Sequence, residues 1–425
     1  MKANSRSSRF AAASAMLGAA MLIASASNYL LNLALARLLD QRSFGDASLM
    51  VTWMLALTAV VVAFQLVTVA SVAGRNDTEV RELRRRLLRP AVGIGIGIAA
   101  GLWISAETLQ STLQTGSSWP FRILGLGIPL YLGQAVDRGV VQARMGFGRL
   151  ALSYVAEAAV RVGAGLMLVV AGFGVSGATL GLALSFGASW LVVAPRSSGR
   201  ATPLPIDPDL QRAAFGPMAL LLGAQVIINN GDVLLSKLVF SPEDAGLYAA
   251  VALVGRAVFF VSWAAVQVVF PSVAAGEKDS THVVNQAAAA IAGFGLAATA
   301  MATFAGRTIA GLLFGSSYVD AAELLGPYAA ATSLFAVINL LVTSDIARGD
   351  SRSAWTMLLG ASAQTLALLV FADGFRSMVW LQVVVMAGLM VAIIRQRQAH
   401  FTITDVPRRP TQRPVLRADR NTLRP

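Results

Sequence analysis

Charged side chains interrupt several long apolar stretches of the sequence. Glu157 and Arg161 are four residues apart, so a helix would place them on one face. Arg138 lies in the preceding apolar stretch, at a similar distance from the short turn that joins the two stretches. Glu157 can therefore pair with Arg138 across a helix interface, which leaves Arg161 as an unpaired cation, or with Arg161 on its own helix. The forked donors of arginine match phosphate and carboxylate oxygens, so these arginines are suited to bind an anion.

A second set of charges lies in the other half of the sequence. Arg256 falls near the middle of an apolar stretch, and Asp232 in the stretch before it is the candidate counterion. Lys237 is close to the end of its stretch, where a lysine side chain is expected to extend to the polar boundary. A buried charge is costly unless it is paired or faces a polar cavity, so such residues are candidates for a binding site.

The complete set of candidates adds amide side chains in the same apolar stretches. The candidate substrate-binding residues are Arg161, Arg256, Arg138, Asn28, Asn32, Gln134, Asn229, Asn230 and Gln267. The candidate ion-coupling or charge-pairing residues are Asp137, Glu157, Asp232 and Asp345.

Residues for other kinds of chemistry are missing or poorly placed. The sequence has no cysteine, which excludes disulfides, thiolate metal sites and a cysteine nucleophile. Its two histidines, His282 and His400, fall in predicted loops or tails, so we expect no metal site and no cofactor. The glycines Gly93, Gly97 and Gly101 are spaced by four inside an apolar stretch, and we interpret them as a smooth face for helix packing.

The composition is that of a membrane protein. The 425 residues are 56% hydrophobic and 13% charged, with a mean hydropathy of +0.65, whereas a soluble domain carries about 25% charged residues. A chain this apolar needs lipid as its solvent. The net charge of +12 comes from short clusters of arginine between apolar stretches and not from a basic face with exposed aromatic residues, so we expect no nucleic-acid partner.

Twelve stretches are apolar and long enough, at about 20 residues, to cross a bilayer as helices. They cover approximately residues 10–36, 45–74, 90–106, 120–143, 149–171, 174–194, 212–238, 245–273, 284–305, 322–345, 353–372 and 376–395. The expected fold is an all-α polytopic membrane protein with about 12 transmembrane helices. We divide it into an N-terminal arm (1–9), a six-helix lobe (10–194), a linker (195–211), a second six-helix lobe (212–395) and a basic tail expected to be disordered (396–425).

The basic residues predict the orientation of these helices. Most of the 34 lysines and arginines fall in the arm, the tail and every second loop. The opposite loops and helix ends hold only Arg37, Arg42, Arg122, Arg307 and Arg376. Because basic loops remain on the cytoplasmic side, both termini and the linker are expected to be cytoplasmic.

The two halves of the sequence contain a weak repeat. Residues 32–39 can be aligned with 232–239, so that Arg37 matches Lys237; one inserted residue later, Gly45 matches Gly246. The offset is half the length of the membrane region. Two halves with an even number of helices are related by a pseudo-two-fold axis along the membrane normal.

The same residues carry a resemblance to a known family. The stretch Leu-Ala-Arg-Leu-Leu-Asp-Gln-Arg-Ser-Phe-Gly at 35–45 resembles the first loop of polysaccharide or O-antigen flippases, which belong to the multidrug/oligosaccharidyl-lipid/polysaccharide (MOP) exporter superfamily. Asp232, Ala-Gly-Leu-Tyr at 245–248 and Val-Val-Phe-Pro at 268–271 resemble the family in their order, as does the segment 139–149. The resemblance implies two six-helix lobes around a central cavity that moves a lipid-linked glycan, and it transfers no individual site residue.

We therefore expect a transporter in the inner membrane that flips a lipid-linked oligosaccharide or polysaccharide repeat unit to the outer leaflet, and not an enzyme. Its expected partners are this substrate, membrane lipids, a polysaccharide polymerase and glycosyltransferases, with H⁺ or Na⁺ as candidate coupling ions. The acidic candidates could bind such an ion, although pairing with a cation is the favoured interpretation. The alternatives are a cation-coupled multidrug exporter, a flippase for peptidoglycan precursors, and a membrane-embedded polymerase or glycosyltransferase.

Overall fold

The computed structural model describes the backbone of residues 2–195, 208–274 and 280–404, and the side chains of residues 16–195, 220–259 and 281–399. All regular elements in these ranges are helices. The N-terminal half contains α1 (Lys2–Leu38), α2 (Gln41–Val72), α3 (Asp77–Thr112), α4 (Trp119–Ala143), α5 (Phe147–Leu168), the π-helical turn η1 (Val169–Phe173) and α6 (Gly174–Val193). The C-terminal half contains α7 (Pro208–Val239), α8 (Pro242–Ala274), α9 (Ser280–Phe304), α10 (Gly306–Leu313), the 3-10 helix η2 (Ser316–Leu324), α11 (Leu325–Ala347), α12 (Arg352–Phe371) and α13 (Phe375–Thr404).

Each of the twelve apolar stretches falls on a helix. Eight helical segments of the described chain are long and apolar enough to cross a membrane, and one of them joins α5 to α6. The other expected spans are α4, which carries Gln134, Asp137 and Arg138, and α7 and α8, whose side chains are described only in part. The chain is thus an all-helical, multi-pass membrane protein.

Several helices extend beyond the apolar stretches. α3 begins at Asp77 because Asn76 and Glu79 form a capping box, in which each side chain accepts a hydrogen bond from the other's backbone N–H. α13 continues to Thr404, so it includes the first part of the predicted tail. Most of the predicted linker, and the tail from residue 405 onward, lie outside the described residues.

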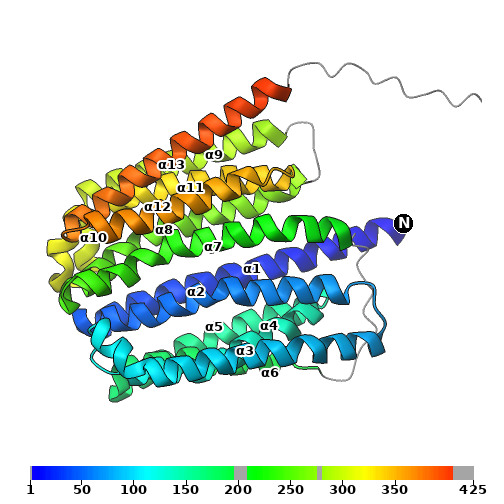
Figure 1. Cartoon of the computed structure of the whole chain (residues 1–425), viewed down its shortest axis with the longest axis horizontal. Coiled ribbons are helices and arrows are strands. Elements are labelled where there is room, and N and C mark those ends of the chain that lie inside the picture. Colours follow the sequence, from blue (N-terminus) through cyan, green and yellow to red (C-terminus); the bar gives the residue numbers. More distant parts are fainter. Residues whose placement is uncertain (1, 196–207, 275–279, 405–425) are drawn as a thin grey trace, which may run out of the picture.

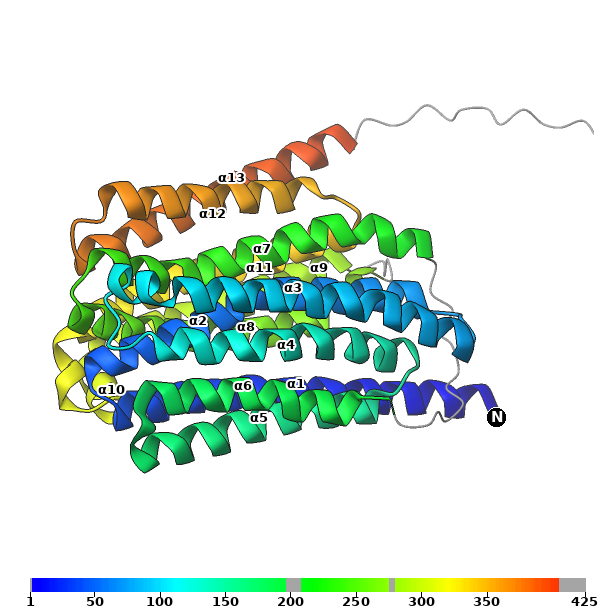
Figure 2. The same cartoon turned by 60° about the horizontal axis from the view of Figure 1, so that its bottom comes forward.

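The helices pack as two groups. α1 packs on α5, and α4 packs on α2, α3 and α6, whereas α11 packs on α8, α9 and α13, and α12 packs on α7. α2 contacts both α7 and α8, and α1 contacts α8, so these four helices join the groups (Figure 1 and Figure 2). We refer to the groups α1–α6 and α7–α13 as the N-lobe and the C-lobe.

The prediction that Gly93, Gly97 and Gly101 form the packing face of α3 is wrong. Open space lies beside Gly93, Gly97 and Gly101, and it is Gly95 that faces another helix. A Cβ atom on Gly95 would lie 2.6 Å from the Cα atom of Pro129 in α4. The spacing of four identified a shared face of α3 but could not show which face its neighbour occupies.

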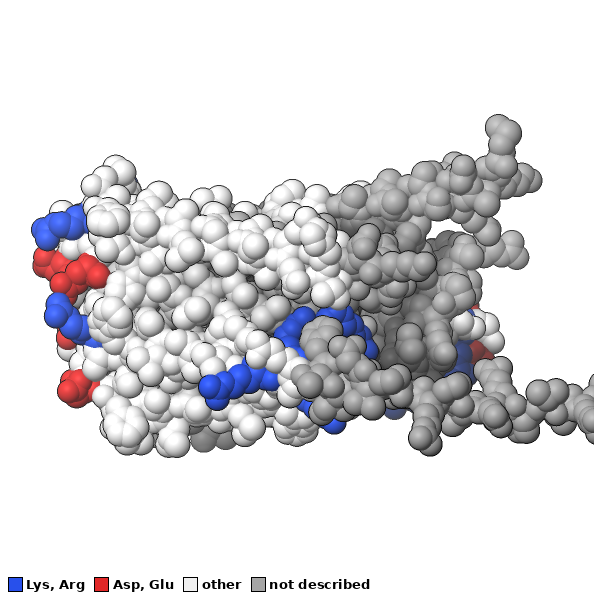
Figure 3. Space-filling view, turned by 90° about the horizontal axis from the view of Figure 1, so that it is seen from above, with Lys and Arg blue, Asp and Glu red and all other residues white. Residues whose placement is uncertain are grey.

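The surface has the charge distribution of a membrane protein. On the side shown in Figure 3, charged side chains gather at the left-hand end, and the surface beside that end shows none until a group of basic side chains near the middle of the face. Large apolar side chains such as Ile104, Leu296 and Leu359 are exposed on the helices, at 83%, 72% and 69%. Exposed apolar residues on this scale match a lipid-facing surface.

Candidate functional site

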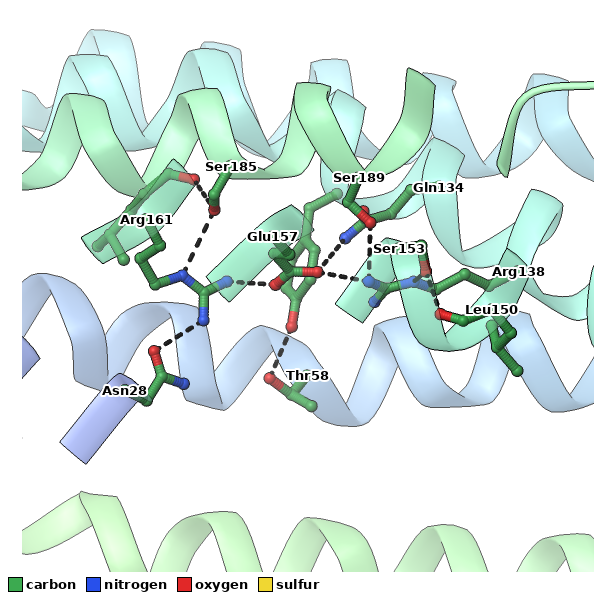
Figure 4. A network of polar contacts seen from close by, with 12 residues as sticks. Asn28, Thr58, Gln134, Arg138, Leu150, Ser153, Glu157, Arg161, Ser185 and Ser189 are labelled. Atoms are coloured by element: carbon green, nitrogen blue, oxygen red, sulfur yellow. Dashed lines mark hydrogen bonds and ion pairs between the residues drawn. The ribbon is translucent and has the colours of Figure 1, made fainter. Parts of the chain in front are cut away.

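Three charged residues predicted from the sequence form one buried network in the N-lobe. Arg138 on α4 donates from Nη2 to the Glu157 carboxylate on α5 at 2.7 Å, and Arg161 donates to the other oxygen of the same carboxylate. Glu157 lies between the two arginines in Figure 4. Both pairings considered for Glu157 are therefore present together, and the expectation that Arg161 is unpaired is wrong.

Neutral side chains hold the Arg138 guanidinium in place. Arg138 donates from Nε to Ser153 Oγ at 3.1 Å and from Nη2 to Ser189 Oγ at 2.7 Å. The guanidinium carbon lies 3.9 Å from the centroid of the Tyr154 ring, a cation–π contact. This set of contacts joins α4, α5 and α6.

Arg161 extends the network to a fourth helix. Its Nη1 donates to Asn28 Oδ1 on α1 at 2.8 Å, and its Nε donates to Ser185 Oγ on α6 at 3.4 Å. The Asn28 backbone carbonyl also accepts a hydrogen bond from Asn32 Nδ2 at 2.9 Å. The predicted residue Asn28 thus contacts Arg161 although its helix is far away in sequence, and Asn32 lies one turn further along the same helix.

The charges in this network do not balance. Two arginines share one carboxylate, so the network carries a formal charge of +1, and Arg138, Glu157 and Arg161 are only 3%, 7% and 5% exposed. Gln134 adds a weak hydrogen bond from Nε2 to Glu157 at 3.5 Å, while its buried Oε1 has no hydrogen-bond partner among the described residues. An uncompensated cation in a desolvated site favours the binding of an anion.

The C-lobe holds a second polar cluster around Asp232 on α7. Its carboxylate accepts hydrogen bonds from Tyr248 at 2.8 Å and Tyr328 at 2.5 Å, and Gln382 donates to the Tyr248 hydroxyl. Arg256 lies 3.8 Å from the same carboxylate, at the limit of an ion pair. The predicted counterion is confirmed, but two tyrosines bind it more closely than the arginine does.

Arg256 keeps donors free. It is 8% exposed, and neither its Nε nor its Nη2 has a hydrogen-bond partner among the described residues. Asn230 on α7 is in a similar state, since its Nδ2 donates to the Val226 carbonyl at 3.2 Å and its buried Oδ1 has no partner in the described region. Asn229 is half-buried beside it, and the side chain of Gln267 lies outside the described residues.

Two acidic candidates belong to separate structural pairs. Asp137 accepts from Arg84 on α3 and from Trp190 Nε1 at 2.7 Å. Asp345 accepts from Arg397 Nη1 on α13 at 2.6 Å and from Ser353 at 2.7 Å. Both carboxylates therefore have a cation and a neutral donor, and among the described residues neither forms a hydrogen bond or ion pair with the N-lobe network.

Lys237 contradicts its sequence-based interpretation. It is only 1% exposed, and its Nζ lies 2.5 Å from Asp46 Oδ1 on α2. The side chain does not extend to the polar boundary because a carboxylate of the other lobe neutralises it. Sequence inspection missed Asp46, although it directly follows Gly45 of the repeat.

Most of the neutral partners could not be identified from the sequence. Ser153, Ser185 and Ser189 bind the arginines, but serines are scattered through every apolar stretch, so nothing distinguishes these three. Tyr248 had a weak signal, because it ends the Ala-Gly-Leu-Tyr motif. The described residues contain no group of three or more histidines, cysteines or carboxylates that could hold a metal ion.

Solved structures share this fold. An inward-facing multidrug resistance MATE family transporter of the MOP superfamily superposes with a TM-score of 0.72 at 14% identity, covering 89% of this chain and 95% of the other. An outward-facing MATE family transporter gives 0.64 at 16% identity, with 93% and 96% covered. The lipid II flippase MurJ in an inward closed conformation gives 0.71 at 10% identity, with 88% and 87% covered. The protein therefore has the fold of the MOP transporters.

Among proteins with this fold, the sequence identifies the family of this chain. The family model described as "Polysaccharide biosynthesis protein" matches residues 34–323, more than half of the chain. This protein belongs to the polysaccharide biosynthesis protein family, and it has the fold of membrane transporters of the MOP superfamily. A sequence search of curated proteins finds no match.

Proposed function

We propose that this protein is a transporter and, more specifically, a flippase, which moves a lipid-linked oligosaccharide or polysaccharide repeat unit from the cytoplasmic to the outer leaflet by alternating access of its two lobes. The observation that carries the proposal is the buried network of Arg138, Glu157 and Arg161, with its formal charge of +1. A lipid-linked glycan presents a phosphate or diphosphate between its lipid and its sugars. A fixed cation lowers the free energy needed to remove water from that group.

Unsatisfied groups in both lobes complement the rest of such a substrate. The free donors of Arg256 suit phosphate or acidic sugar oxygens. The free acceptors of Gln134 and Asn230 suit sugar hydroxyls. Because these groups lie on α4, α7 and α8, both lobes can contact one headgroup while its lipid tail stays in the bilayer.

The proposed orientation follows from the basic residues. The α2–α3 turn and the start of α3 hold Arg75, Arg81, Arg85, Arg86 and Arg89, and such clusters mark the cytoplasmic side. Both termini would then be cytoplasmic, in the inner membrane. A polysaccharide polymerase on the outer side and glycosyltransferases on the cytoplasmic side are the partners that this reaction sequence requires.

A cation-coupled multidrug exporter is the second candidate. Asp232 favours it, because a buried carboxylate held by two tyrosines can bind a proton or a cationic ligand. The N-lobe network opposes it, since a site with net positive charge repels cationic drugs. The peptidoglycan-precursor flippase remains an outcome of the experiment below, because its substrate is also a lipid-linked diphosphate.

Transport of purified protein in liposomes tests the proposal. The liposomes would contain lipid-linked glycan extracted from cells lacking this protein, and an impermeant glycan-modifying enzyme would report the leaflet. We expect leaflet exchange to depend on the protein and to fall with Arg161→Gln and Arg256→Gln. Exchange of lipid II alone, or export of cationic drugs without glycan movement, would reject the proposed substrate.

A further inference from the structure

We propose that the buried ion pair between Asp46 and Lys237 is the lock that holds the two lobes together at the outer end, and that it must open to release substrate. This proposal rests on the proposed alternating access, and in it Asp46 and Lys237 control opening at the outer end. Asp46 is 4% exposed and Lys237 1% exposed, and the pair joins α2 of the N-lobe to α7 of the C-lobe.

Asp46 forms contacts within its own lobe as well as with the other lobe. Its Oδ2 accepts a hydrogen bond from the Gly116 backbone N–H at 2.8 Å, in the turn between α3 and α4. Its Oδ1 accepts from Lys237 Nζ at 2.5 Å. One carboxylate oxygen therefore anchors the residue within the N-lobe, and the other contacts the C-lobe.

The backbones of the two lobes meet beside this ion pair. A Cβ atom on Gly45 would lie 3.1 Å from the Gly246 Cα atom and 3.1 Å from Lys237 Nζ. A Cβ atom on Gly246 would lie 1.8 Å from the Gln41 carbonyl oxygen. The two glycines thus allow the start of α2 to approach the start of α8 closely enough for the ion pair to form.

A second layer of contacts surrounds the lock. Arg37 donates from Nε to the Leu313 carbonyl at 2.9 Å, and Gln41 donates from Nε2 to the Ser317 carbonyl at 2.6 Å. The rings of Phe44 and Tyr318 meet edge to face, with centroids 6.2 Å apart. These contacts attach the turn between α1 and α2 to α10 and η2.

Where the side chains are described, the polar contacts between lobes lie at this end of the molecule. Among the described residues, the hydrogen bonds and ion pairs that join the lobes involve only Arg37, Gln41 and Asp46 from the N-lobe. In Figure 1 this end lies opposite the labelled N-terminus. The proposed orientation places it outside, and the better superposition on the inward-facing transporter than on the outward-facing one agrees with a closed outer end.

The ion pair can act as a lock because neither charge is stable alone in this site. Separating the lobes requires water to reach both groups, whereas removing one partner leaves the other charge buried and uncompensated. Replacing both groups with neutral ones removes the attraction without leaving such a charge. The double neutral variant Asp46→Asn/Lys237→Gln should therefore favour opening, and the exchanged pair Asp46→Lys/Lys237→Asp should restore closure.

Cysteine labelling can measure this opening, because the natural sequence contains no cysteine. Ala249, one turn after Gly246 in α8, is 1% exposed and would carry the probe as Ala249→Cys. An impermeant maleimide would be added outside intact cells. We expect labelling to be on the order of tenfold faster in the double neutral variant and to return toward the original rate in the exchanged pair.

Two controls make the result decisive. Ser111→Cys, which is exposed in the α3–α4 region, should label equally fast in every background. Neutralising the exposed pair with Glu323→Gln/Arg376→Gln should leave Ala249→Cys labelling unchanged, because this pair lies within the C-lobe. Gel filtration of each variant identifies any that fail to fold. The exchanged variant Asp46→Lys/Lys237→Asp tests whether restoring the ion pair reverses the faster labelling of the double neutral variant.

A cross-link provides the converse measurement. In the variant Asp46→Cys/Lys237→Cys, a short bifunctional thiol reagent should join the lobes and abolish transport, and its cleavage by reductant should restore transport. Unchanged labelling in the double neutral variant, or full transport after complete cross-linking, would overturn the lock. Labelling that responds as expected, while the unmodified protein moves no glycan in liposomes, would reject the proposed substrate and retain the lock.

Discussion

Gly45 and Gly246, which occupy matching positions in the two halves of the sequence, contact each other at the starts of α2 and α8. Equivalent residues can touch only where the axis that relates the halves passes between them. The pseudo-two-fold axis therefore runs beside the Asp46–Lys237 pair. The matching glycines of the sequence repeat are therefore also the residues at which the two lobes meet.

Gly246→Ala should destabilise the protein by about 1–3 kcal/mol, the usual effect of extra atoms in a tightly packed site. The added methyl group would meet the Gln41 carbonyl oxygen, which cannot move without shifting α2. Thermal unfolding in detergent would measure the loss. Gly293→Ala is the matched control, because open space surrounds Gly293, and equal effects of the two substitutions would contradict the close contact.

Glu157→Gln should cost about 3–5 kcal/mol of stability, because it leaves two buried arginines without a counterion. Arg138 and Arg161 both depend on this carboxylate. The double variant Glu157→Gln/Arg138→Gln should recover part of the loss, since one cation is removed with the anion. Thermal unfolding of the single and double variants would measure this, and a double variant less stable than Glu157→Gln would argue against shared charge compensation.

Arg161→Gln should reduce glycan exchange by at least about tenfold, because it removes the excess positive charge and a forked donor. Arg161→Lys keeps the charge but loses the fork, so we expect an intermediate rate. Arg86→Gln is the control, since Arg86 is exposed on α3 and its ion pair within the described part of the chain is with Glu82. The liposome leaflet assay would give all three rates, and equal rates for Arg161→Gln and Arg86→Gln would remove Arg161 from the site.

Tyr328→Phe should cost about 1.5–3 kcal/mol, the range for a hydrogen bond to a charged group, because Asp232 loses its 2.5 Å donor. Tyr131→Phe is a neutral comparison, since the Tyr131 hydroxyl is 2.9 Å from the Thr58 hydroxyl. It should cost about 0.5–1.5 kcal/mol. Chemical unfolding of both variants provides the comparison, and a smaller loss at Tyr328 than at Tyr131 would contradict a charge-assisted hydrogen bond to Asp232.

The fold was largely predictable because lipid imposes simple rules on sequence. Twelve apolar stretches each fall on a helix, since a chain in lipid must satisfy its backbone hydrogen bonds within each segment. The Arg138–Glu157 contact was predictable for a related reason, because the short turn between α4 and α5 fixes the relative depth of the two residues.

Contacts between distant helices were not predictable in this way. The partners of Lys237 and Arg161 include Asp46 and Asn28, and their pairing depends on how the lobes and helices meet after folding. The wrong face chosen for the α3 glycines has the same cause. Spacing along one helix identifies residues that share a face, whereas the neighbour of that face is determined by tertiary packing.

The odd number of charges around Glu157 has an electrical consequence. The network of Arg138, Glu157 and Arg161 keeps a charge of +1 when empty, and bound phosphate would cancel or reverse it. In the proposed cycle, the loaded and empty protein would differ in charge, so at least one of the two conformational steps would move net charge through the membrane field. A potential of 100 mV changes the energy of such a step by about 2.3 kcal/mol per elementary charge, so the membrane voltage itself would drive part of the cycle.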